Sequence, residues 1–329
     1  MNVFANANPR DLAHALTIVK QTQQAGLTAT LAGGGSDLLG LMKERLVTPD
    51  VLVNLNAIKG LDQIKRQGGV VVIGGLITLD SLANHPLIRR QYSVLAEAAE
   101  SVGTPQIRNV GTLAGNVCQR PWCWYYRNGF KCLKNGGTVC YSVAGENEFH
   151  AIFGGGPSYI VHPSDTAPAL VALDAEFRIA GASGERTVAA AEFFTLPTVN
   201  PARENVLKDD EVLVAIVLPA PRAAARSTYH NVLDREAWTH AVVSAAIVLD
   251  MDKDVCRRAR VVLGGVAPIP WRLPEVEQLL TGKRVTPALA ANAGAAAVAG
   301  ARPLAKNGYK VPMTQAMVRR TIEGLAKSG

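Results

Sequence analysis

Four of the five cysteines in this chain lie in one short segment, at Cys118, Cys123, Cys132 and Cys140, with four, eight and seven residues between them. The intervening glycine and asparagine residues allow the backbone to fold back on itself. Four thiolates can then converge, which is the arrangement that a metal centre requires. The segment is therefore predicted to be a loop that an inorganic group holds together.

These thiols have three interpretations. Two disulfides would suit an exported protein. A structural zinc ion usually has at least one ligand pair at C-x-x-C-like spacing, and this segment contains none. A [4Fe–4S] cluster suits four cysteines of one loop, although the spacing matches neither common ferredoxin pattern. We favour the cluster, and the residues alone leave all three interpretations open.

A glycine-rich turn near the N-terminus is the second feature. Residues 28–31 are predicted to be a strand, and they run into Ala32, Gly33, Gly34, Gly35, Ser36, Asp37 and Leu38, after which helical spacing resumes at Leu41. A strand, a glycine turn and a helix in this order direct unpaired backbone N–H groups to one point, where a diphosphate fits. A tight turn without a ligand is the alternative. The segment does not spell a dinucleotide fingerprint or a P-loop.

Two further segments carry short polar side chains. Residues 103–116, which directly precede the cysteines, are punctuated by glycine and can present N–H groups and hydroxyls to a ligand, as a surface turn also would. Residues 159–165 are predicted to be a strand end and a turn before a helix. Asp165 either caps that helix or turns its carboxylate toward hydroxyl groups of a ligand.

Length and composition set the scale. With 329 residues, 48% of them hydrophobic, the chain can bury a sizeable core and is expected to form two or three units. Mixed runs of strand and helix predict an α/β architecture, and the proline-rich segment 219–226 predicts a domain boundary near residue 225. Cys256, isolated in the last unit, is expected to be an ordinary side chain.

Charge and hydropathy restrict the function classes. The net charge is +7, but the basic residues are dispersed and do not alternate with aromatics, so nucleic-acid binding is not expected. Neither an export signal nor a membrane span is visible. A cytoplasmic location is expected, with export by a partner's signal as the alternative.

Together these motifs resemble the FAD-binding medium subunits of the xanthine dehydrogenase family of molybdenum hydroxylases, over almost the whole chain. The segments that carry the resemblance are residues 31–39 (LAGGGSDLL), 107–116 (IRNVGTLAGN), 162–165 (HPSD) and 263–268 (LGGVAP). Most such subunits continue past the Gly-Asn pair without cysteines. The insertion here resembles the variant that carries a [4Fe–4S] cluster, as in aldehyde oxidoreductases and hydroxybenzoyl-CoA reductases.

The resemblance implies a fold and a set of site residues. The expected fold is α/β (α+β), with a vanillyl-alcohol-oxidase-type FAD-binding unit made of subdomains 1–58 and 59–224, the second including an iron–sulfur loop at 118–140, and a C-terminal α/β domain at 225–329. The residues implied to hold FAD are Ala32, Gly33, Gly34, Gly35, Ser36, Asp37, Leu38, Thr104, Ile107, Gly111, Thr112, Gly115, Asn116 and Asp165. Those implied to hold the cluster are Cys118, Cys123, Cys132 and Cys140. No acid–base pair is required, because the flavin supplies the chemistry.

The resemblance also implies partners. A second cysteine group for [2Fe–2S] centres is missing, and the chain is too short to bind molybdopterin as well, so we expect a molybdopterin-binding large subunit and a [2Fe–2S] small subunit. The substrate would be an aldehyde, a purine or another aromatic heterocycle, and the external acceptor NAD, a quinone, ferredoxin or oxygen. The alternatives are a free-standing FAD-dependent reductase on the same fold and a zinc-stabilised interaction module without redox activity.

Overall fold

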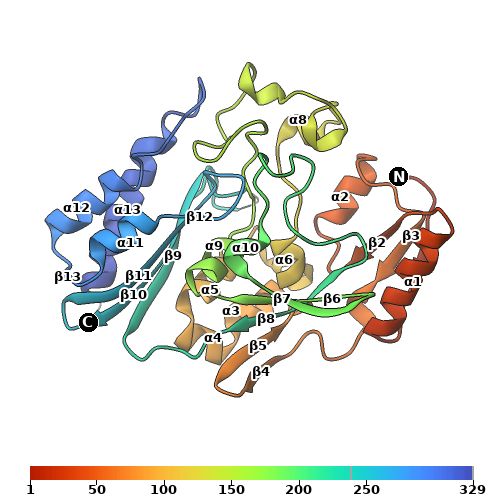
Figure 1. The fold of residues 1–329 in the computed structure, drawn as a ribbon, viewed down its shortest axis with the longest axis horizontal. Helices are drawn as coiled ribbons and strands as arrows, with labels where there is room; N and C mark the ends of the chain where they lie inside the picture. The colour runs from red at the N-terminus through yellow and green to blue at the C-terminus, as the bar shows by residue number, and fades with distance from the viewer. Residues whose placement is uncertain (238, 328–329) are drawn as a thin grey trace.

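A computed structural model describes residues 1–237 and 239–327, and within them the chain forms three β-sheets (Figure 1). The colours of Figure 1 separate the sheets along the sequence: the first is red, the second mixes orange and green, and the third is blue-green. The predicted mixed α/β architecture is confirmed. No helix in the described part of the chain is both long and apolar enough to cross a membrane.

The first sheet is small and entirely parallel, in the order β1-β3-β2. Its strands and helices are β1 (Ala5–Ala7), α1 (Leu12–Gln24), β2 (Ala29–Ala32), α2 (Leu38–Lys43), β3 (Val51–Asn54) and the 3-10 turn η1 (Leu55–Ala57). Helix α1 packs Ala15 and Val19 against Val53 of the central strand. Asp11 caps α1 by accepting a hydrogen bond from the backbone N–H of His14 at 2.8 Å.

The second sheet is antiparallel, in the order β4-β5-β8-β6-β7. Its strands are β4 (Ile64–Gln67), β5 (Val70–Gly74), β6 (Glu176–Gly181), β7 (Gly184–Ala189) and β8 (Val212–Leu218). The helices that accompany it are α3 (Leu79–Asn84), α4 (Pro86–Gln91), α5 (Ser93–Glu100), α6 (Pro105–Val110), α7 (Leu113–Val117), α9 (Thr166–Ala172) and α10 (Ala190–Phe193). Side chains of this sheet and of α3, α5 and α9 share the largest hydrophobic core.

The third sheet lies between two layers of helices. It contains β9 (Ala225–Val232), β10 (Val243–Asp252), β11 (Val255–Gly264), β12 (Trp271–Arg272) and β13 (Lys283–Arg284), followed or interrupted by α11 (Pro274–Leu280), α12 (Pro287–Ala296) and α13 (Lys310–Lys327). Along β10, Ala246 and Val248 join the core shared with α5 and α9, whereas Ala245, Ile247 and Leu249 join the core beneath α11 to α13. Because successive strand residues face opposite sides, this double burial explains the continuous apolar run in the sequence.

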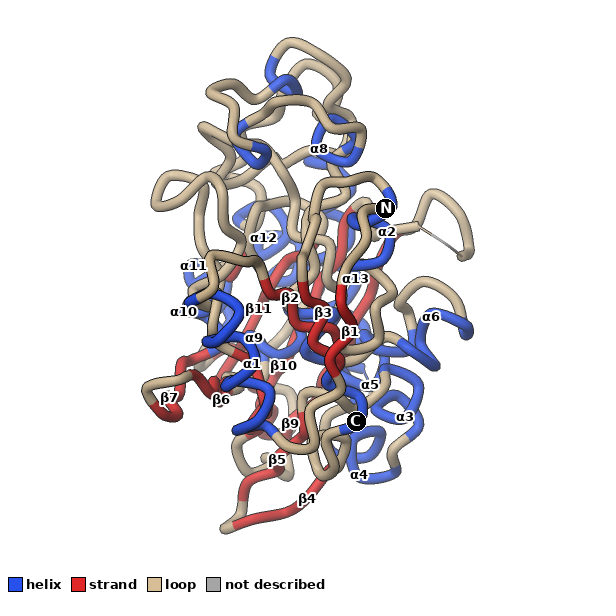
Figure 2. Tube along the Cα trace, turned by 90° about the vertical axis from the view of Figure 1, so that its right-hand side faces the viewer, coloured by secondary structure: helices blue, strands red, loops and turns tan. Residues whose placement is uncertain are grey.

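The segment between α7 and α9 contains no strand. We call residues 118–160 the cysteine lobe; it holds only α8 (Trp124–Arg127) and the 3-10 turns η2 (Leu133–Asn135) and η3 (Tyr141–Val143). Figure 2 shows it as a mass of loops at one end of the molecule, away from the sheets. The prediction of a loop over residues 118–140 is thus confirmed, apart from these short turns.

Candidate functional site

The two glycine-rich segments, far apart in the sequence, are in direct contact. A Cβ atom added to Gly34 would lie 1.7 Å from the carbonyl oxygen of Val110, and one added to Gly33 would lie 2.9 Å from Oγ1 of Thr112. The backbones can approach this closely only because side chains are absent. Glycine at position 34 is therefore required by the contact between the two segments.

The turn after β2 presents backbone donors without protein acceptors. Within the described residues, the N–H groups of Gly34, Gly35, Ser36 and Asp37 donate to no hydrogen-bond acceptor. Gly35 adopts a left-handed conformation, with φ of 73°, which re-aims the turn into α2. A row of unpaired N–H groups beside a glycine-lined contact suits the oxygens of a diphosphate, so this cradle fits the cofactor implied by the sequence.

The second glycine segment is fixed by threonine caps and backbone bonds. Thr104 caps α6 by accepting from the N–H of Ile107 at 3.3 Å, and Thr112 caps α7 by accepting from the N–H of Gly115 at 3.2 Å. The carbonyl of Gly111 accepts from the N–H of Leu79 at 2.9 Å, which ties the segment to α3. The hydroxyl oxygens of Thr104 and Thr112 therefore accept the capping hydrogen bonds. Neither hydroxyl group donates a hydrogen bond to an acceptor within the described residues, so both can donate to a ligand.

Asn116 joins this segment to the turn before α9. Its side-chain oxygen Oδ1 accepts hydrogen bonds from the hydroxyls of Ser164 and Thr166, both at 2.6 Å. Ser164, in turn, accepts from the N–H of Ala167 at 3.0 Å and so caps α9. Asn116 is buried and holds together two motifs that the sequence identified separately.

Asp165 does not cap α9, one of the two roles considered for it. Its buried carboxyl group instead accepts a hydrogen bond from the hydroxyl of Tyr229 on β9, which links the glycine-loop half of the molecule to the third sheet. Burial raises the pKa of Asp165 to about 7, against the opposing effect of the Tyr229 hydrogen bond. The sequence did not reveal Tyr229 as its partner.

Asp37 connects the glycine turn to the cysteine lobe. Its Oδ2 accepts from the backbone N–H of Arg120 at 3.0 Å, and its Oδ1 accepts from the Arg127 guanidinium at 2.7 Å. The Arg127 guanidinium also lies 4.4 Å from the ring centroid of Trp122, which holds the cation in place. The side chain of Asp37 is therefore committed to the lobe, while its N–H remains with the cradle.

A shallow hollow beside the glycine turn was not predicted. Its lining comes from the end of the first sheet and from the β5–α3 connection, and consists of Asn56, Ile58, Asp62, Leu76, Ile77, Thr78 and Ser81. Asn56 also donates from Nδ2 to the carbonyl of Gly33 at 2.9 Å, which places the hollow next to the cradle. None of these residues stands in a motif, so no sequence pattern pointed to them.

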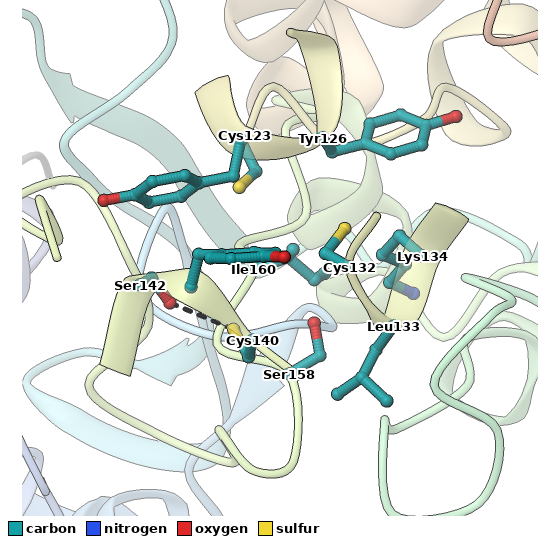
Figure 3. Close-up of a pocket in the computed structure, with 11 residues that line it drawn as sticks. Cys123, Tyr126, Cys132, Leu133, Lys134, Cys140, Ser142, Ser158 and Ile160 are labelled. Atoms are coloured by element: carbon teal, nitrogen blue, oxygen red, sulfur yellow. Dashed lines mark hydrogen bonds between the residues drawn. The ribbon is translucent and has the colours of Figure 1, made fainter. Parts of the chain in front are cut away.

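Three of the four clustered cysteines surround one cavity in the cysteine lobe. Figure 3 shows the sulfur atoms of Cys123, Cys132 and Cys140 around it. The complete lining is Cys123, Tyr125, Tyr126, Cys132, Leu133, Lys134, Cys140, Tyr141, Ser142, Ser158 and Ile160. Burial raises the pKa of Cys123 to about 11, and a buried thiol of this kind needs a bound cation to become a thiolate ligand. Soft sulfur donors around a cavity fit an iron–sulfur group.

Cys118 and Cys256 lie elsewhere. Cys118 follows the last residue of α7 and packs against the main core, and it is not among the residues that line the cavity. Burial raises the pKa of Cys118 to about 12. Cys256 is buried in the core of the third sheet and donates to the carbonyl of Arg258 at 3.3 Å, as expected of an ordinary side chain.

A buried ion network supports the cavity wall. The Nζ of Lys134 lies 2.8 Å from one carboxylate oxygen of Glu204, and Nε of Arg120 lies 2.8 Å from the other. Lys134 also donates to the carbonyl of Arg203 at 3.0 Å. Burial lowers the pKa of Lys134, and Glu204 opposes that effect. The lysine places a positive charge beside thiols that would bind iron as anions.

His150 also belongs to this region and was not singled out from the sequence. Its Nε2 lies 3.3 Å from Sγ of Cys123, and the side chain is buried. Burial lowers the pKa of His150 to about 4, so the imidazole is neutral. Its Nδ1 has no partner among the described residues.

Comparison with known proteins identifies the family. Residues 2–221 match the family described as the FAD binding domain in molybdopterin dehydrogenase, and residues 228–325 match the CO dehydrogenase flavoprotein C-terminal domain. Aldehyde oxidoreductase FAD-binding subunit PaoB of Escherichia coli (strain K12) is 35% identical over 293 residues, which cover 86% of this chain and 87% of that one. Carbon monoxide dehydrogenase medium chain of Hydrogenophaga pseudoflava is 28% identical, covering 95% of this chain and 94% of that one.

Solved structures agree with these matches. A structure of carbon monoxide dehydrogenase from Hydrogenophaga pseudoflava superimposes with a TM-score of 0.76 at 26% identity, covering 97% of this chain and 96% of that one. The fold is also shared with quinoline 2-oxidoreductase from Pseudomonas putida 86, at a TM-score of 0.77. The fold and the glycine cradle thus define an FAD-binding flavoprotein. More particularly, the chain belongs to the FAD-binding medium subunits of the xanthine dehydrogenase family of molybdenum hydroxylases, and it is an oxidoreductase subunit.

Proposed function

We propose that this chain is the electron-transfer subunit of a multi-subunit molybdenum hydroxylase. In this assembly a molybdopterin-binding large subunit oxidises the substrate, a small subunit with [2Fe–2S] clusters conducts the electrons, and FAD on this chain delivers them to an external acceptor. The observation that carries the proposal is the contact between the two glycine segments, which leaves a row of unpaired N–H groups for a diphosphate. Subdomains 1–58 and 59–224 would enclose the cofactor, with 225–329 beside them.

The proposed FAD contacts divide into two groups. The turn from Ala32 to Leu38 would hold the diphosphate through backbone N–H groups, since the Asp37 carboxylate is already bonded to the cysteine lobe. The remaining contacts come from the second glycine segment and from the turn before α9, and are Thr104, Ile107, Gly111, Thr112, Gly115, Asn116 and Asp165. The bound flavin supplies two-electron and one-electron redox chemistry, and the protein positions it and tunes it.

The substrate class proposed for the complex is an aldehyde or an aromatic heterocycle. PaoB, at 35% identity, is named as a subunit of an aldehyde oxidoreductase, and this similarity favours an aldehyde. Oxidation would occur on the partner, so no acid–base pair is assigned to this chain.

The cavity in the cysteine lobe is proposed to hold a [4Fe–4S] cluster. Three thiols from Cys123, Cys132 and Cys140 surround it, and Lys134 provides a nearby positive charge. Each iron of a cubane cluster takes one protein ligand, so thiols spread around a cavity suit a cluster. The clustering of the cysteines predicts Cys118 as the fourth ligand, but Cys118 is not among the residues that line the cavity.

Purification of the native complex tests the proposal. We expect size-exclusion chromatography to give a heterotrimer or a dimer of heterotrimers, with one FAD and about four irons on this subunit in addition to the irons of the partner. A visible spectrum with iron and zinc analysis of the isolated subunit separates the alternatives. A colourless protein that contains zinc and no flavin would overturn the proposal, and a lone chain that oxidises substrate unaided would point to a free-standing reductase.

A further inference from the structure

The predicted cluster lacks one thiol at its cavity. Cys118 is held by the end of α7: its backbone N–H donates to the carbonyl of Ala114 at 2.9 Å, and its neighbour Val117 is fully buried. Its side chain packs against the main hydrophobic core rather than lining the cavity of the other three. The end of α7 is also held close to the turn before α9, because Asn116 accepts hydrogen bonds from Ser164 and Thr166.

His150 offers a nitrogen donor directly beside one of the cavity's thiols, although His150 itself is not among the residues that line the cavity. Its Nε2 is 3.3 Å from Sγ of Cys123, and its ring centroid is 6.3 Å from that of Tyr125, which lines the cavity with Cys123. The side chain is 4% exposed, and its second ring nitrogen has no partner in the described part of the chain. A thiol is a weak hydrogen-bond partner, so Nε2 can exchange this contact for a bond to a metal.

The backbone of His150 is held in this place from three sides. Its N–H donates to the carbonyl of Asn147 at 3.0 Å, and its carbonyl accepts from Nδ2 of Asn307 at 3.0 Å. The next residue, Ala151, donates its N–H to the carbonyl of Tyr159 at 2.9 Å. These bonds hold the backbone of His150 in place beside Cys123.

Other donors near the cavity are weaker candidates. Lys134 is a cation whose Nζ is engaged by Glu204 at 2.8 Å. The hydroxyl of Ser142 lies 3.1 Å from Sγ of Cys140 and already has that partner. Imidazole nitrogen, in contrast, is an established ligand of iron in iron–sulfur proteins: in Rieske centres two histidines replace two cysteines on one of the two irons.

The geometry points to His150 Nε2, and not Cys118, as the fourth protein ligand of the centre held by Cys123, Cys132 and Cys140. This inference rests on the proposed function, because it assumes that the lobe binds a [4Fe–4S] cluster. A neutral imidazole in place of a thiolate makes the cluster less negative by one charge, so its reduction potential rises. The centre would accept electrons more readily than one with four cysteines.

The test uses the native complex with four forms of this subunit: wild type, Cys118→Ser, His150→Ala and His150→Cys. Iron per chain is measured with FAD per chain as the internal control. Pulsed EPR of the reduced cluster looks for nitrogen coupling from an imidazole. We expect Cys118→Ser to keep wild-type iron and nitrogen coupling, and His150→Ala to lose iron or give the EPR signal of a three-iron cluster while keeping FAD. His150→Cys is expected to restore about four irons without the coupling and at a lower potential.

The outcomes distinguish the absence of the cluster from the absence of a histidine ligand. A wild-type complex that holds FAD but no iron beyond that of the partner's [2Fe–2S] clusters would defeat the cluster itself, and this inference with it. Wild-type protein with a cluster, no nitrogen coupling and iron loss only in Cys118→Ser would overturn the role of His150 and leave the proposed function standing. If both single variants lose iron, the nitrogen coupling in the wild type decides the ligand.

Discussion

The buried carboxyl group of Asp165 makes the stability of this protein depend on pH, and Asp165→Asn removes that dependence. The group is fully buried against Tyr229, and burial raises its pKa from 3.8 to about 7. Below pH 3.8 the carboxyl group is protonated in both the folded and the unfolded state. Between pH 3.8 and 7 the unfolded chain releases the proton while the folded protein keeps it, so the free energy of unfolding falls as the pH rises.

The size of this effect follows from the pKa difference. A rise of roughly 3 units at about 1.4 kcal/mol per unit gives at most about 4 kcal/mol of stability that is present at low pH and lost above pH 7. Reorganisation of the protein around the ionised carboxylate lowers the figure, so we expect about 2–4 kcal/mol. Asparagine copies the shape and neutrality of the protonated acid and can still accept the Tyr229 hydrogen bond.

The assay is urea unfolding of the isolated subunit at pH 5 and pH 8. Since other groups titrate equally in both proteins, the difference between Asp165→Asn and wild type isolates this carboxyl group. By pH 5 the unfolded chain has already released most of this proton, so we expect the variant to be more stable than wild type by about 1–2 kcal/mol at pH 5 and by about 2–4 kcal/mol at pH 8. Tyr229→Phe removes the donor that favours the ionised form and is expected to steepen the pH dependence. An equal difference between Asp165→Asn and wild type at both pH values would refute the reasoning.

Three further predictions concern the two loops. Gly34→Ala is expected to lower the free energy of unfolding by more than ~3 kcal/mol and to release FAD, because the added methyl group would overlap the backbone carbonyl of Val110. Gly40→Ala, in open space on α2, is the control and is expected to raise the free energy of unfolding by up to about 1 kcal/mol. Flavin absorbance measures FAD content, and thermal unfolding measures stability, for both variants. Lys134→Met removes one of the two cations that pair with the buried Glu204 carboxylate. It is expected to lower the free energy of unfolding by about 3 kcal/mol, measured by urea unfolding. Arg127→Leu is expected to lower FAD and iron content together, and loss of neither would contradict the link between the loops.

The sequence predicted the parts of the structure that depend on local patterns. The strand, glycine turn and helix around Gly34 are found as expected, because backbone sterics and helical spacing are local properties.

The remaining site features depend on contacts between distant segments, which no local pattern contains. Asp165 was assigned to a helix cap or a ligand, and its partner Tyr229 lies 64 positions away in the sequence. Likewise, the spacing of cysteines considers only cysteines, so His150 was overlooked although it lies beside Cys123. The one signal that could have found it is a histidine shortly after the last clustered cysteine, since iron and zinc sites commonly mix the two residue types.

Asp37 shows how the two proposed cofactor sites depend on each other. Its backbone N–H belongs to the cradle, and its carboxylate holds Arg120 and Arg127 at the entry and at the first helix of the cysteine lobe. Ordering the glycine turn therefore fixes the carboxylate, and a fixed carboxylate lowers the entropy cost of ordering the lobe. Because such coupling is reciprocal, a group bound in the lobe favours FAD binding by the same free energy with which FAD favours the lobe. The sequence places Asp37 in the diphosphate motif, whereas the contacts of its side chain give it this second role.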